Sequence, residues 1–250
     1  MSMIRFDHVT KEFAGGKRVL DDVSYEIDKG EIFTIVGPSG TGKSVSLKHM
    51  IRLLTPTSGR VWIGDDCVSE ASGRDLSRIR SRFGYLFQSA ALLAWMNVED
   101  NVALPLREKT NLTEGEIAGK VAAALEAVGL SGEGAAYPAD LSGGMQKRAG
   151  LARAIVTQPE IVLYDEPTSG LDPVTSRRID ALIADLSARL GITSVVVTHD
   201  LQGALAISSR IALLSRGRVL CIEPPDSFSR STIPEARAFL DAQGIRPSGA

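Results

Sequence analysis

The chain has few of the features that mark extracellular, membrane-spanning or nucleic-acid-binding proteins. Its two cysteines, Cys67 and Cys221, lie far apart without metal-ligand spacing, which favours two thiols in a reducing compartment over a disulfide framework or zinc site. No stretch approaches the roughly 20 apolar residues that a membrane helix needs, and residues 1–8 lack the apolar core of a secretory signal. The formal net charge of −2 gives no electrostatic reason to expect nucleic acid or anionic lipid as the main partner. These absences predict a cytoplasmic protein, and any membrane role must then come through a partner.

The composition and length are those of a globular domain, with 44% hydrophobic and 23% charged residues among 250. Apolar runs rich in β-branched and aromatic residues predict strands. Three runs, at 32–36, 161–164 and 193–197, are continuous rather than alternating, a pattern that suits central parallel strands covered on both faces. The closely spaced strands near the two ends of the pattern look antiparallel. The predicted strands cover residues 4–9, 19–27, 32–36, 61–63, 83–87, 161–164, 193–198, 211–214 and 218–222.

The strand pattern disappears between residues 98 and 157. Apolar residues from Ile117 to Val128 recur at helical spacing, and Gly129 supplies a helix stop. We interpret this part as a helical subdomain inserted into an α/β core. The expected plan is a single domain over 1–224, with its core at 1–90 and 158–224 and the helical subdomain at 91–157, followed by a short helical tail at 225–250.

A glycine-rich loop lies between the strand at 32–36 and a helix-like stretch at 45–54, the context in which a phosphate-binding loop occurs. Glycines let backbone N–H groups curve around phosphate oxygens, and a helix start directs its positive dipole end at the same anion. Lys43 would reach the β- and γ-phosphates, and Ser44 would bind Mg²⁺. The loop comprises Gly37, Pro38, Ser39, Gly40, Thr41, Gly42, Lys43 and Ser44.

Two carboxylates, Asp165 and Glu166, follow the apolar strand at 161–164. Open α/β sheets bind their ligands at the carboxyl ends of strands. Adjacent residues of a strand point to opposite sides, so these two should have different functions. Gln88 and His199 also follow predicted strands. Taken alone, a glutamine at a strand end is more often a turn residue, and a histidine after a strand is usually a helix-start or surface residue.

A third motif, Leu141-Ser142-Gly143-Gly144-Met145, stands between the other two. Ser142 is a good N-cap for a helix at 145–156, and the glycines expose N–H groups at the helix start. This makes a second anion site in one chain. Two such sites make sense if this one binds a nucleotide that is held mainly by another subunit; the structural alternative is a capped helix without a ligand.

In this order, from Phe13 to His199, the motifs resemble those of ATP-binding cassette (ABC) ATPases over essentially the whole chain. The resemblance implies an α/β P-loop NTPase fold with a RecA-like core, an N-terminal antiparallel β subdomain and an inserted helical subdomain. It also implies an ATPase that uses ATP and Mg²⁺ and works as a dimer, in which two copies close around two nucleotides.

The resemblance assigns roles to individual residues. Glu166 polarises the attacking water, His199 holds that water in line, and Lys43 and Gln88 complete the catalytic set. Mg²⁺ is bound by Ser44, Gln88 and Asp165. ATP contacts the phosphate loop, Val45 and, by adenine stacking, Phe13; the second copy contributes Ser142, Gly143, Gly144, Met145 and Asp172, the last from a segment that resembles the D-loop.

Val45 departs from the family pattern, in which most members have a threonine after the loop serine. The lost hydroxyl removes one hydrogen bond to phosphate, worth about 1 kcal/mol. We therefore expect lower nucleotide affinity without loss of the site.

The segment after Gln88, residues 86–107, resembles the ATPase of bacterial phospholipid transporters that work with mammalian-cell-entry (MCE) proteins. Met145, where most members have glutamine, fits the same subgroup. This resemblance implies a peripheral protein on the cytoplasmic face of the inner membrane. Its partners would be a permease pair, a periplasmic MCE ring and a small regulatory protein, with no nucleic acid.

Two other interpretations stay open. An ATPase of a solute importer, for example for amino acids, shares every catalytic motif and differs only in the segment after Gln88. A soluble ABC ATPase acting on DNA or ribosomes is disfavoured by the lack of a second cassette, a coiled-coil insertion and a basic patch. Leu92, Leu93 and Trp95 fit either helical packing or a groove for the cytoplasmic helix of a membrane partner.

Overall fold

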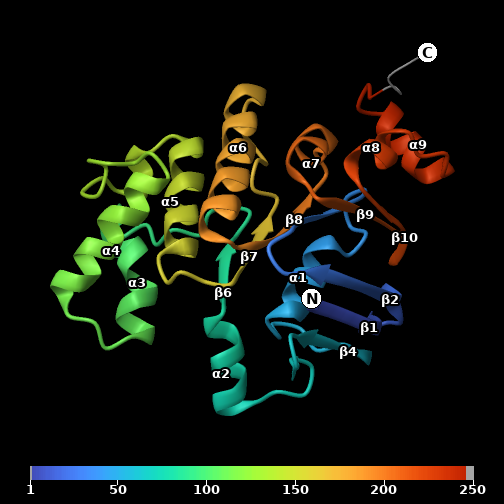
Figure 1. Cartoon of the computed structure of the whole chain (residues 1–250), viewed down its shortest axis with the longest axis horizontal. Coiled ribbons are helices and arrows are strands. Elements are labelled where there is room, and N and C mark those ends of the chain that lie inside the picture. Colours follow the sequence, from blue (N-terminus) through green and yellow to red (C-terminus); the bar gives the residue numbers. More distant parts are fainter. Residues whose placement is uncertain (1, 246–250) are drawn as a thin grey trace. The chain divides into compact units, whose positions relative to one another are not determined.

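The structure, a computed structural model, describes residues 2–245, which form two compact units (Figure 1). The first unit contains residues 2–80 and 193–245, and the second contains residues 81–192. Within the described residues, no helix is both long enough and apolar enough to cross a membrane.

An antiparallel sheet of order β2-β1-β4-β5 forms one part of the first unit. Phe6 on β1 stands opposite Tyr25 on β2, and their rings stack 4.5 Å apart; Tyr25 in turn stacks on Phe33 at 5.5 Å. This aromatic column joins the sheet to the strand that precedes the phosphate loop, and the antiparallel pairing confirms the prediction for the first strands. The strands are β1 (Ser2–Phe13), β2 (Lys17–Asp28), β4 (Ser58–Ile63) and β5 (Asp66–Cys67).

Parallel strands form the other part of the first unit. β3 (Ile32–Val36) lies between β8 (Thr193–Thr198) and β9 (Arg210–Ser215) and is parallel to both, while β10 (Arg218–Glu223) is antiparallel to β9. β8 is buried along its whole length and β3 along nearly all of it, as their continuous apolar runs predict.

Short helices complete the first unit. Apolar residues of α7, α8 and α9 pack against β3 and β9 around Phe228, which is fully buried. α8 and α9 lie within residues 225–250, where a helical tail is expected; residues 246–250 lie outside the described residues. The helices are α1 (Lys43–Met50), α7 (Leu201–Ile207), α8 (Pro225–Ser229) and α9 (Pro234–Asp241), and α2 (Gly73–Ser81) ends this part of the chain.

The second unit has two parallel strands, β6 (Phe83–Leu86) and β7 (Ile161–Asp165), and is otherwise helical. Among the described residues no strand lies between β6 and β7, as predicted. α5 packs against β6 and against the three other α-helices of this unit. These helices are α3 (Val98–Lys109), α4 (Glu114–Ala127), α5 (Gly143–Ile155) and α6 (Pro173–Leu190).

α4 begins and ends where local chemistry dictates. Thr113 and Glu116 form a reciprocal capping box at its start. Just past its end, Gly129 adopts φ +66°, the left-handed conformation that glycine takes at helix ends, so the predicted stop is confirmed. The boundaries of a helical subdomain at 91–157 stay a prediction.

Candidate active site

The predicted phosphate loop leaves β3 and turns into α1 through three glycines with positive φ, Gly37 (+152°), Gly40 (+79°) and Gly42 (+106°). A Cβ at Gly37 would lie 2.1 Å from the carbonyl oxygen of Leu214, and one at Gly42 would lie 2.8 Å from that of Val19. A Cβ at Gly40 would meet no described atom within 4 Å. Two of the glycines therefore permit close backbone packing, and the third lies on the open side of the loop.

Lys43 lies inside this loop and is only 6% exposed. Its Nζ donates to the carbonyl oxygens of Gly37 at 2.8 Å and Pro38 at 3.1 Å, and the hydroxyl of Thr41 also donates to Pro38 at 2.9 Å. Within the described chain no side chain caps α1. A lysine ammonium beside an uncapped helix start is a site whose charge and N–H groups fit a phosphate chain.

His199 lies at the same edge of the parallel strands as the phosphate loop. β3 and β8 run parallel with Val36 opposite Thr198, so the residues that follow each strand leave the sheet together. His199 is exposed, and the next residue, Asp200, caps α7 by accepting from the N–H of Gly203 at 3.2 Å. The fold of the first unit thus brings together the loop and the predicted catalytic histidine.

The carboxylates and Gln88 are brought together in the second unit. β6 and β7 are parallel neighbours, so exposed Gln88 and the Asp165-Glu166 pair follow adjacent strand ends. Asp165 is 8% exposed and accepts a hydrogen bond from the Tyr85 hydroxyl at 3.3 Å. Burial, together with the Asp165 charge, raises the pKa of Tyr85, so this phenol stays a proton donor to the carboxylate.

Glu166 has φ +50°, a left-handed conformation that residues with a side chain rarely adopt. The strand ends at Asp165, so the two carboxylates are separated by this backbone turn and not by simple strand alternation. Such strained conformations persist where the surrounding structure holds them and concentrate at functional sites.

The motif at residues 141–145, which resembles the signature motif of ABC ATPases, caps and begins α5. The hydroxyl of Ser142 accepts from the N–H of Met145 at 3.4 Å. A Cβ at Gly143 would lie 3.3 Å from Leu171, and one at Gly144 would lie 2.7 Å from Thr175. Gly143 therefore packs against residues 169–172, the segment that resembles the D-loop, and Gly144 packs against the start of α6.

Asp172 in that segment caps α6. Its Oδ1 accepts from the N–H groups of Val174 and Thr175, both at 3.0 Å, and the hydrogen bonds with Thr175 hold the pKa of Asp172 below its ordinary value. The predicted signature and D-loop therefore come together within the second unit.

Two further predicted contacts lie in the first unit. Phe13 ends β1 and is 38% exposed, with the ammonium of Lys11 5.2 Å above its ring. Val45 is half-buried on α1, and its carbonyl oxygen accepts a hydrogen bond from Nδ1 of His49 at 2.7 Å.

Some residues that hold this machinery through long-range contacts are not predictable from the sequence. Tyr85 is one, and Lys147 and Arg153 on α5 are others. The sequence signal for Lys147 is a cation at the fifth position of α5, one helical turn before Gly150 and Leu151.

Residues 20–169 match the family described as ABC transporter, which is more than half of the chain. The chain belongs to the ABC transporter family. It is the ATP-binding subunit of such a transporter and an ATPase.

Curated relatives extend the match over nearly the full length of this ABC ATPase. The probable ribonucleotide transport ATP-binding protein mkl of Mycobacterium leprae is 43% identical over 241 residues, 96% of this chain and 69% of the relative. The methionine import ATP-binding protein MetN 1 of Pectobacterium atrosepticum is also 43% identical, over 93% of this chain and 69% of the relative.

Solved structures share the fold. The bacterial ABC transporter cassette MJ0796, solved as a dimer in a post-hydrolysis state with ADP and Pi, superposes with a TM-score of 0.82 at 34% identity, covering 89% of this chain and 99% of its own. CbiO1 of Clostridium perfringens, part of the transporter complex cbiONQ, gives 0.84 at 25% identity over 97% of this chain and 99% of its own. A cassette dimer with membrane permease partners is typical of this family.

Proposed function

We propose that this ABC ATPase hydrolyses ATP at sites shared between two copies of the chain. The observation that carries the proposal is the presence of two glycine-rich helix starts in one chain, at α1 beside Lys43 and at α5 behind Ser142. Each offers backbone N–H groups and a positive helix dipole to an anion. On this proposal one γ-phosphate contacts both kinds of helix start. The start of α5 therefore binds the nucleotide that is held by the partner copy.

The phosphates of ATP would be held by the loop N–H groups and by Lys43 after its ammonium exchanges the carbonyl oxygens of Gly37 and Pro38 for phosphate oxygens. Hydroxyl, amide and carboxylate oxygens from Ser44, Gln88 and Asp165 are hard ligands that suit Mg²⁺. When bound, Mg²⁺ would neutralise charge on the phosphates.

The chemical step is in-line attack of water on the γ-phosphorus. Glu166 accepts the proton of the water as the new P–O bond forms, the bond from the γ-phosphorus to the β–γ bridging oxygen breaks, and ADP and phosphate leave. His199 holds the water and Glu166 in line. The partner copy contributes Ser142, Gly143, Gly144, Met145 and Asp172, and Phe13 stacks on the adenine.

The test is Glu166→Gln, which keeps the side-chain shape but cannot accept the proton. We expect turnover to fall by about 100-fold or more, since general-base catalysis typically contributes this much, and ATP to trap a dimer on size-exclusion chromatography. Glu160→Gln is the matched control, because Glu160 precedes the same strand at its other end and pairs with Arg82 at 2.9 Å. Unchanged turnover in Glu166→Gln would refute the assigned role.

For the transported substrate we propose phospholipid, moved between the inner membrane and MCE-protein partners by a complex that also contains a permease pair and a small regulatory protein. The support is the segment 86–107 and Met145. The relatives named for ribonucleotide and methionine transport have equal identity, 43%, so identity does not separate lipid from solute transport. A solute importer is the second candidate.

Purification of the native complex from membranes tests this assignment. Copurification of a permease, an MCE protein and phospholipid supports it, and a substrate-binding protein for a polar solute contradicts it. On this proposal the ATPase lies on the cytoplasmic face of the inner membrane and binds no nucleic acid.

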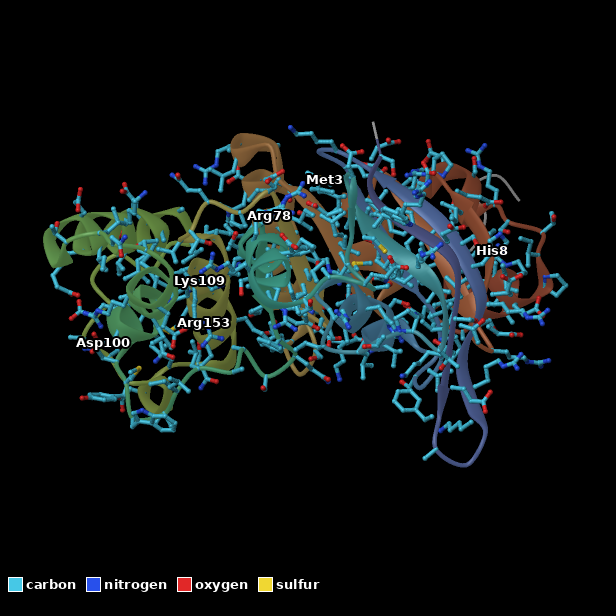
Figure 2. All side chains as sticks on the ribbon, turned by 90° about the horizontal axis from the view of Figure 1, so that it is seen from below. Met3, His8, Arg78, Asp100, Lys109 and Arg153 are labelled. Atoms are coloured by element: carbon cyan, nitrogen blue, oxygen red, sulfur yellow. The ribbon has the colours of Figure 1, made fainter. Side chains whose placement is uncertain are left out.

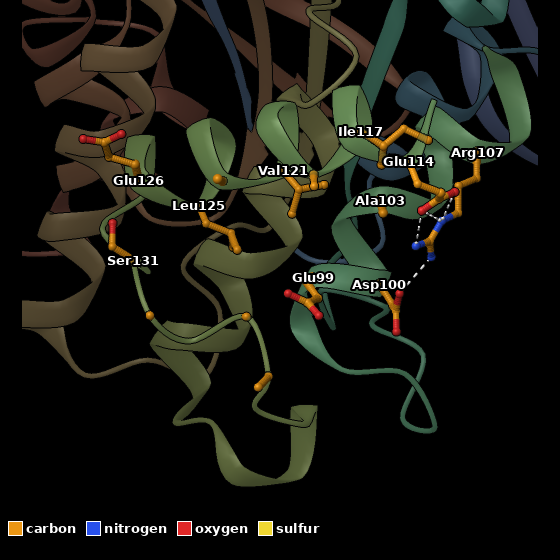
Figure 3. A pocket seen from close by; sticks show the side chains of 15 residues that line it. Glu99, Asp100, Ala103, Arg107, Glu114, Ile117, Val121, Leu125, Glu126 and Ser131 are labelled. Atoms are coloured by element: carbon orange, nitrogen blue, oxygen red, sulfur yellow. Dashed lines mark hydrogen bonds and ion pairs between the residues drawn. The ribbon is translucent and has the colours of Figure 1, made fainter. Parts of the chain in front are cut away.

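We further propose that a permease helix binds a groove of the second unit between α3 and α4, a cavity of about 590 Å³ (Figure 3). Arg107 reaches across the rim to Asp100 at 2.8 Å and Glu114 at 2.9 Å, so the single rim cation is already engaged. The apolar floor and negative rim fit an amphipathic helix with Lys or Arg on one side. The floor includes Ala103, Ile117, Val121 and Leu125, and the rim carries Glu99, Asp100, Glu114 and Glu126.

Glu126→Lys tests the groove. We expect it to weaken copurification of the permease and to leave ATP binding by the chain unchanged. Lys120→Glu, on the same helix but outside the groove lining, is the control. Retained copurification in Glu126→Lys would contradict the site.

A further inference from the structure

Lys147 on α5 is a buried cation that contacts the backbone behind two predicted catalytic residues. It is 5% exposed, and its Nζ donates to the carbonyl oxygen of Gln88 and, at 3.2 Å, to the carbonyl oxygen of Glu166. These residues follow different strands, β6 and β7, and lie 59 and 19 positions from Lys147. One ammonium therefore joins the two strand ends.

The charge surroundings keep this contact in place. Burial lowers the pKa of Lys147, while the carboxylates of Glu166 and Asp165 act in the opposite direction. A buried ammonium is tolerated only where hydrogen-bond acceptors and opposite charge compensate its desolvation. Two carbonyl oxygens and two nearby carboxylates supply this compensation.

Arg153, six residues further along α5, holds the segment that follows Gln88. Its guanidinium donates to the carbonyl oxygens of Ala90 at 2.6 Å and Ala91 at 2.7 Å. Both alanines have left-handed backbones, with φ +58° and +49°. Arg153 is labelled in Figure 2, on the ribbon of α5.

Gly150 lies between the two cations on the same side of α5, since residues three apart share a helix face. A Cβ there would lie 2.9 Å from the Leu86 side chain and 3.1 Å from that of Ala90. α5 thus approaches the segment closely at Gly150. On either side of this glycine, Lys147 and Arg153 donate hydrogen bonds to residues 88–91.

We propose that Lys147 and Arg153 are positioning residues of the ATPase, which fix the backbone of residues 88–91 and of Glu166 to α5. This inference rests on the proposed function, because it acts through Gln88 and Glu166. The helix that holds them is the one that begins at Ser142. A nucleotide held by the partner copy and bound at that helix start is therefore coupled through one helix to the water-positioning groups of this copy.

The test compares Lys147→Met and Lys147→Arg in the full chain assembled with its permease. Lys147→Met keeps the apolar stem but loses the donor; we expect kcat to fall about 10- to 100-fold, a typical cost of misplaced catalytic groups, and the KM for ATP to stay within two-fold. Lys147→Arg restores hydrogen-bond donors and should recover most of kcat. Equal loss in Met and Arg variants, or a loss that appears only in KM, would overturn the proposal.

Arg148→Met is the matched control. Arg148 is the next residue on α5 and also donates to backbone carbonyls, those of Val128 and Gly129, but these follow α4 and lie outside residues 88–91. A purely structural effect of losing such a bond would lower the melting temperature alike in both variants and kcat in neither. A comparable loss of kcat in Arg148→Met would therefore count against a specific role for Lys147.

A double mutant tests whether Lys147 acts through Gln88, independently of whether the proposed ATPase function is correct. If Lys147 acts through Gln88, Lys147→Met should lower kcat much less in a Gln88→Ala background than in the wild type. Full additivity overturns the proposed action through Gln88. If the wild type hydrolyses ATP and Glu166→Gln does not, the proposed function stands whatever Lys147→Met does; Arg153→Met is expected to follow Lys147→Met.

Discussion

The side-chain amide of Gln243 donates from Nε2 to the carbonyl oxygen of His199 at 2.6 Å. Its Oε1 accepts from the N–H of Leu201 at 2.9 Å, so one glutamine pairs with the backbone on both sides of Asp200. Gln243 follows α9, whose Leu240 belongs to the same buried cluster as Leu201. The C-terminal helix therefore holds the loop that carries the predicted catalytic histidine.

Replacement of Gln243 by leucine should loosen this loop. The loss of two hydrogen bonds to backbone groups is expected to lower the free energy of unfolding by about 1–3 kcal/mol. We also expect a several-fold lower kcat at unchanged KM for ATP, measured by phosphate release. Gln202→Leu, at an exposed position of α7, is the control. An unchanged kcat in Gln243→Leu would show that the contact does not position His199.

Lys43→Met should weaken ATP binding more than it weakens the fold. Hydrogen bonds to charged groups contribute about 1.5–3 kcal/mol each, so loss of the ammonium predicts roughly 10- to 100-fold lower affinity. Fluorescent-nucleotide titration measures the affinity, and thermal unfolding checks that the protein stays folded. Lys48→Met, exposed on the same helix, should leave affinity unchanged. An unchanged affinity in Lys43→Met would contradict the phosphate-loop assignment.

Two glycines of the phosphate loop should respond differently to alanine. Gly37→Ala places a Cβ 2.1 Å from the backbone oxygen of Leu214, which cannot move without disturbing β9, so we expect a loss of about 3 kcal/mol or more. The Cβ added by Gly40→Ala meets no described atom within 4 Å. The only cost is that of a left-handed backbone at a residue with a side chain, a loss of about 1–2 kcal/mol of stability. Urea unfolding measures both, and equal losses would contradict the close packing at Gly37.

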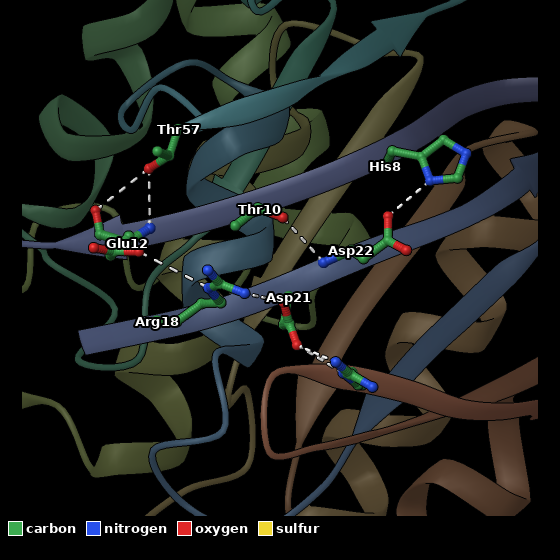
Figure 4. Close-up of polar contacts among 8 residues, drawn as sticks. His8, Thr10, Glu12, Arg18, Asp21, Asp22 and Thr57 are labelled. Carbon is green, nitrogen blue, oxygen red and sulfur yellow. Dashed lines mark hydrogen bonds and ion pairs between the residues drawn. The ribbon is translucent and has the colours of Figure 1, made fainter. Parts of the chain in front are cut away.

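A pH-dependent contact lies in the antiparallel sheet. Nδ1 of His8 lies 2.7 Å from Oδ1 of Asp22 across β1 and β2 (Figure 4). The hydrogen bond to Asp22 raises the pKa of His8 above its ordinary 6.5. A raised pKa stabilises the fold below pH 6.5, and this contribution is lost as the pH rises through the folded-state pKa.

His8→Gln should therefore lower the melting temperature slightly at pH 5.5 and leave it almost unchanged at pH 8.5. Both residues are largely exposed, so the effect should also shrink in high salt. A difference between wild type and variant that is the same at both pH values would contradict the pair as its cause.

Those parts of the protein whose chemistry lies in consecutive residues are predictable from the sequence. The phosphate loop and the signature are recognisable because glycines, a lysine and a capping serine at fixed spacing determine the local backbone. Buried parallel strands such as β3 and β8 are recognisable because their apolar runs are continuous. The helix stop at Gly129 follows from the same local logic.

For some helices the pattern of apolar residues in the sequence is too weak to predict them. α2 was not predicted because Ile79 is its one buried residue and, apart from Gly73 and half-buried Leu76, the other residues are polar. α3 contains Pro105 within the helix, which breaks the pattern that a helix prediction depends on, although Asn97 caps its start.

The contacts that hold the motifs depend on long-range packing. The contact of Gln243 with His199 spans 44 residues and that of Lys147 with Gln88 spans 59, so each depends on how separate helices pack and not on local spacing. The left-handed backbone of Glu166 has no local cause, because a glutamate intrinsically avoids it. Surrounding contacts such as the hydrogen bond from Lys147 hold it there. The motifs identify the class of reaction, and long-range packing sets the positions of the motif residues.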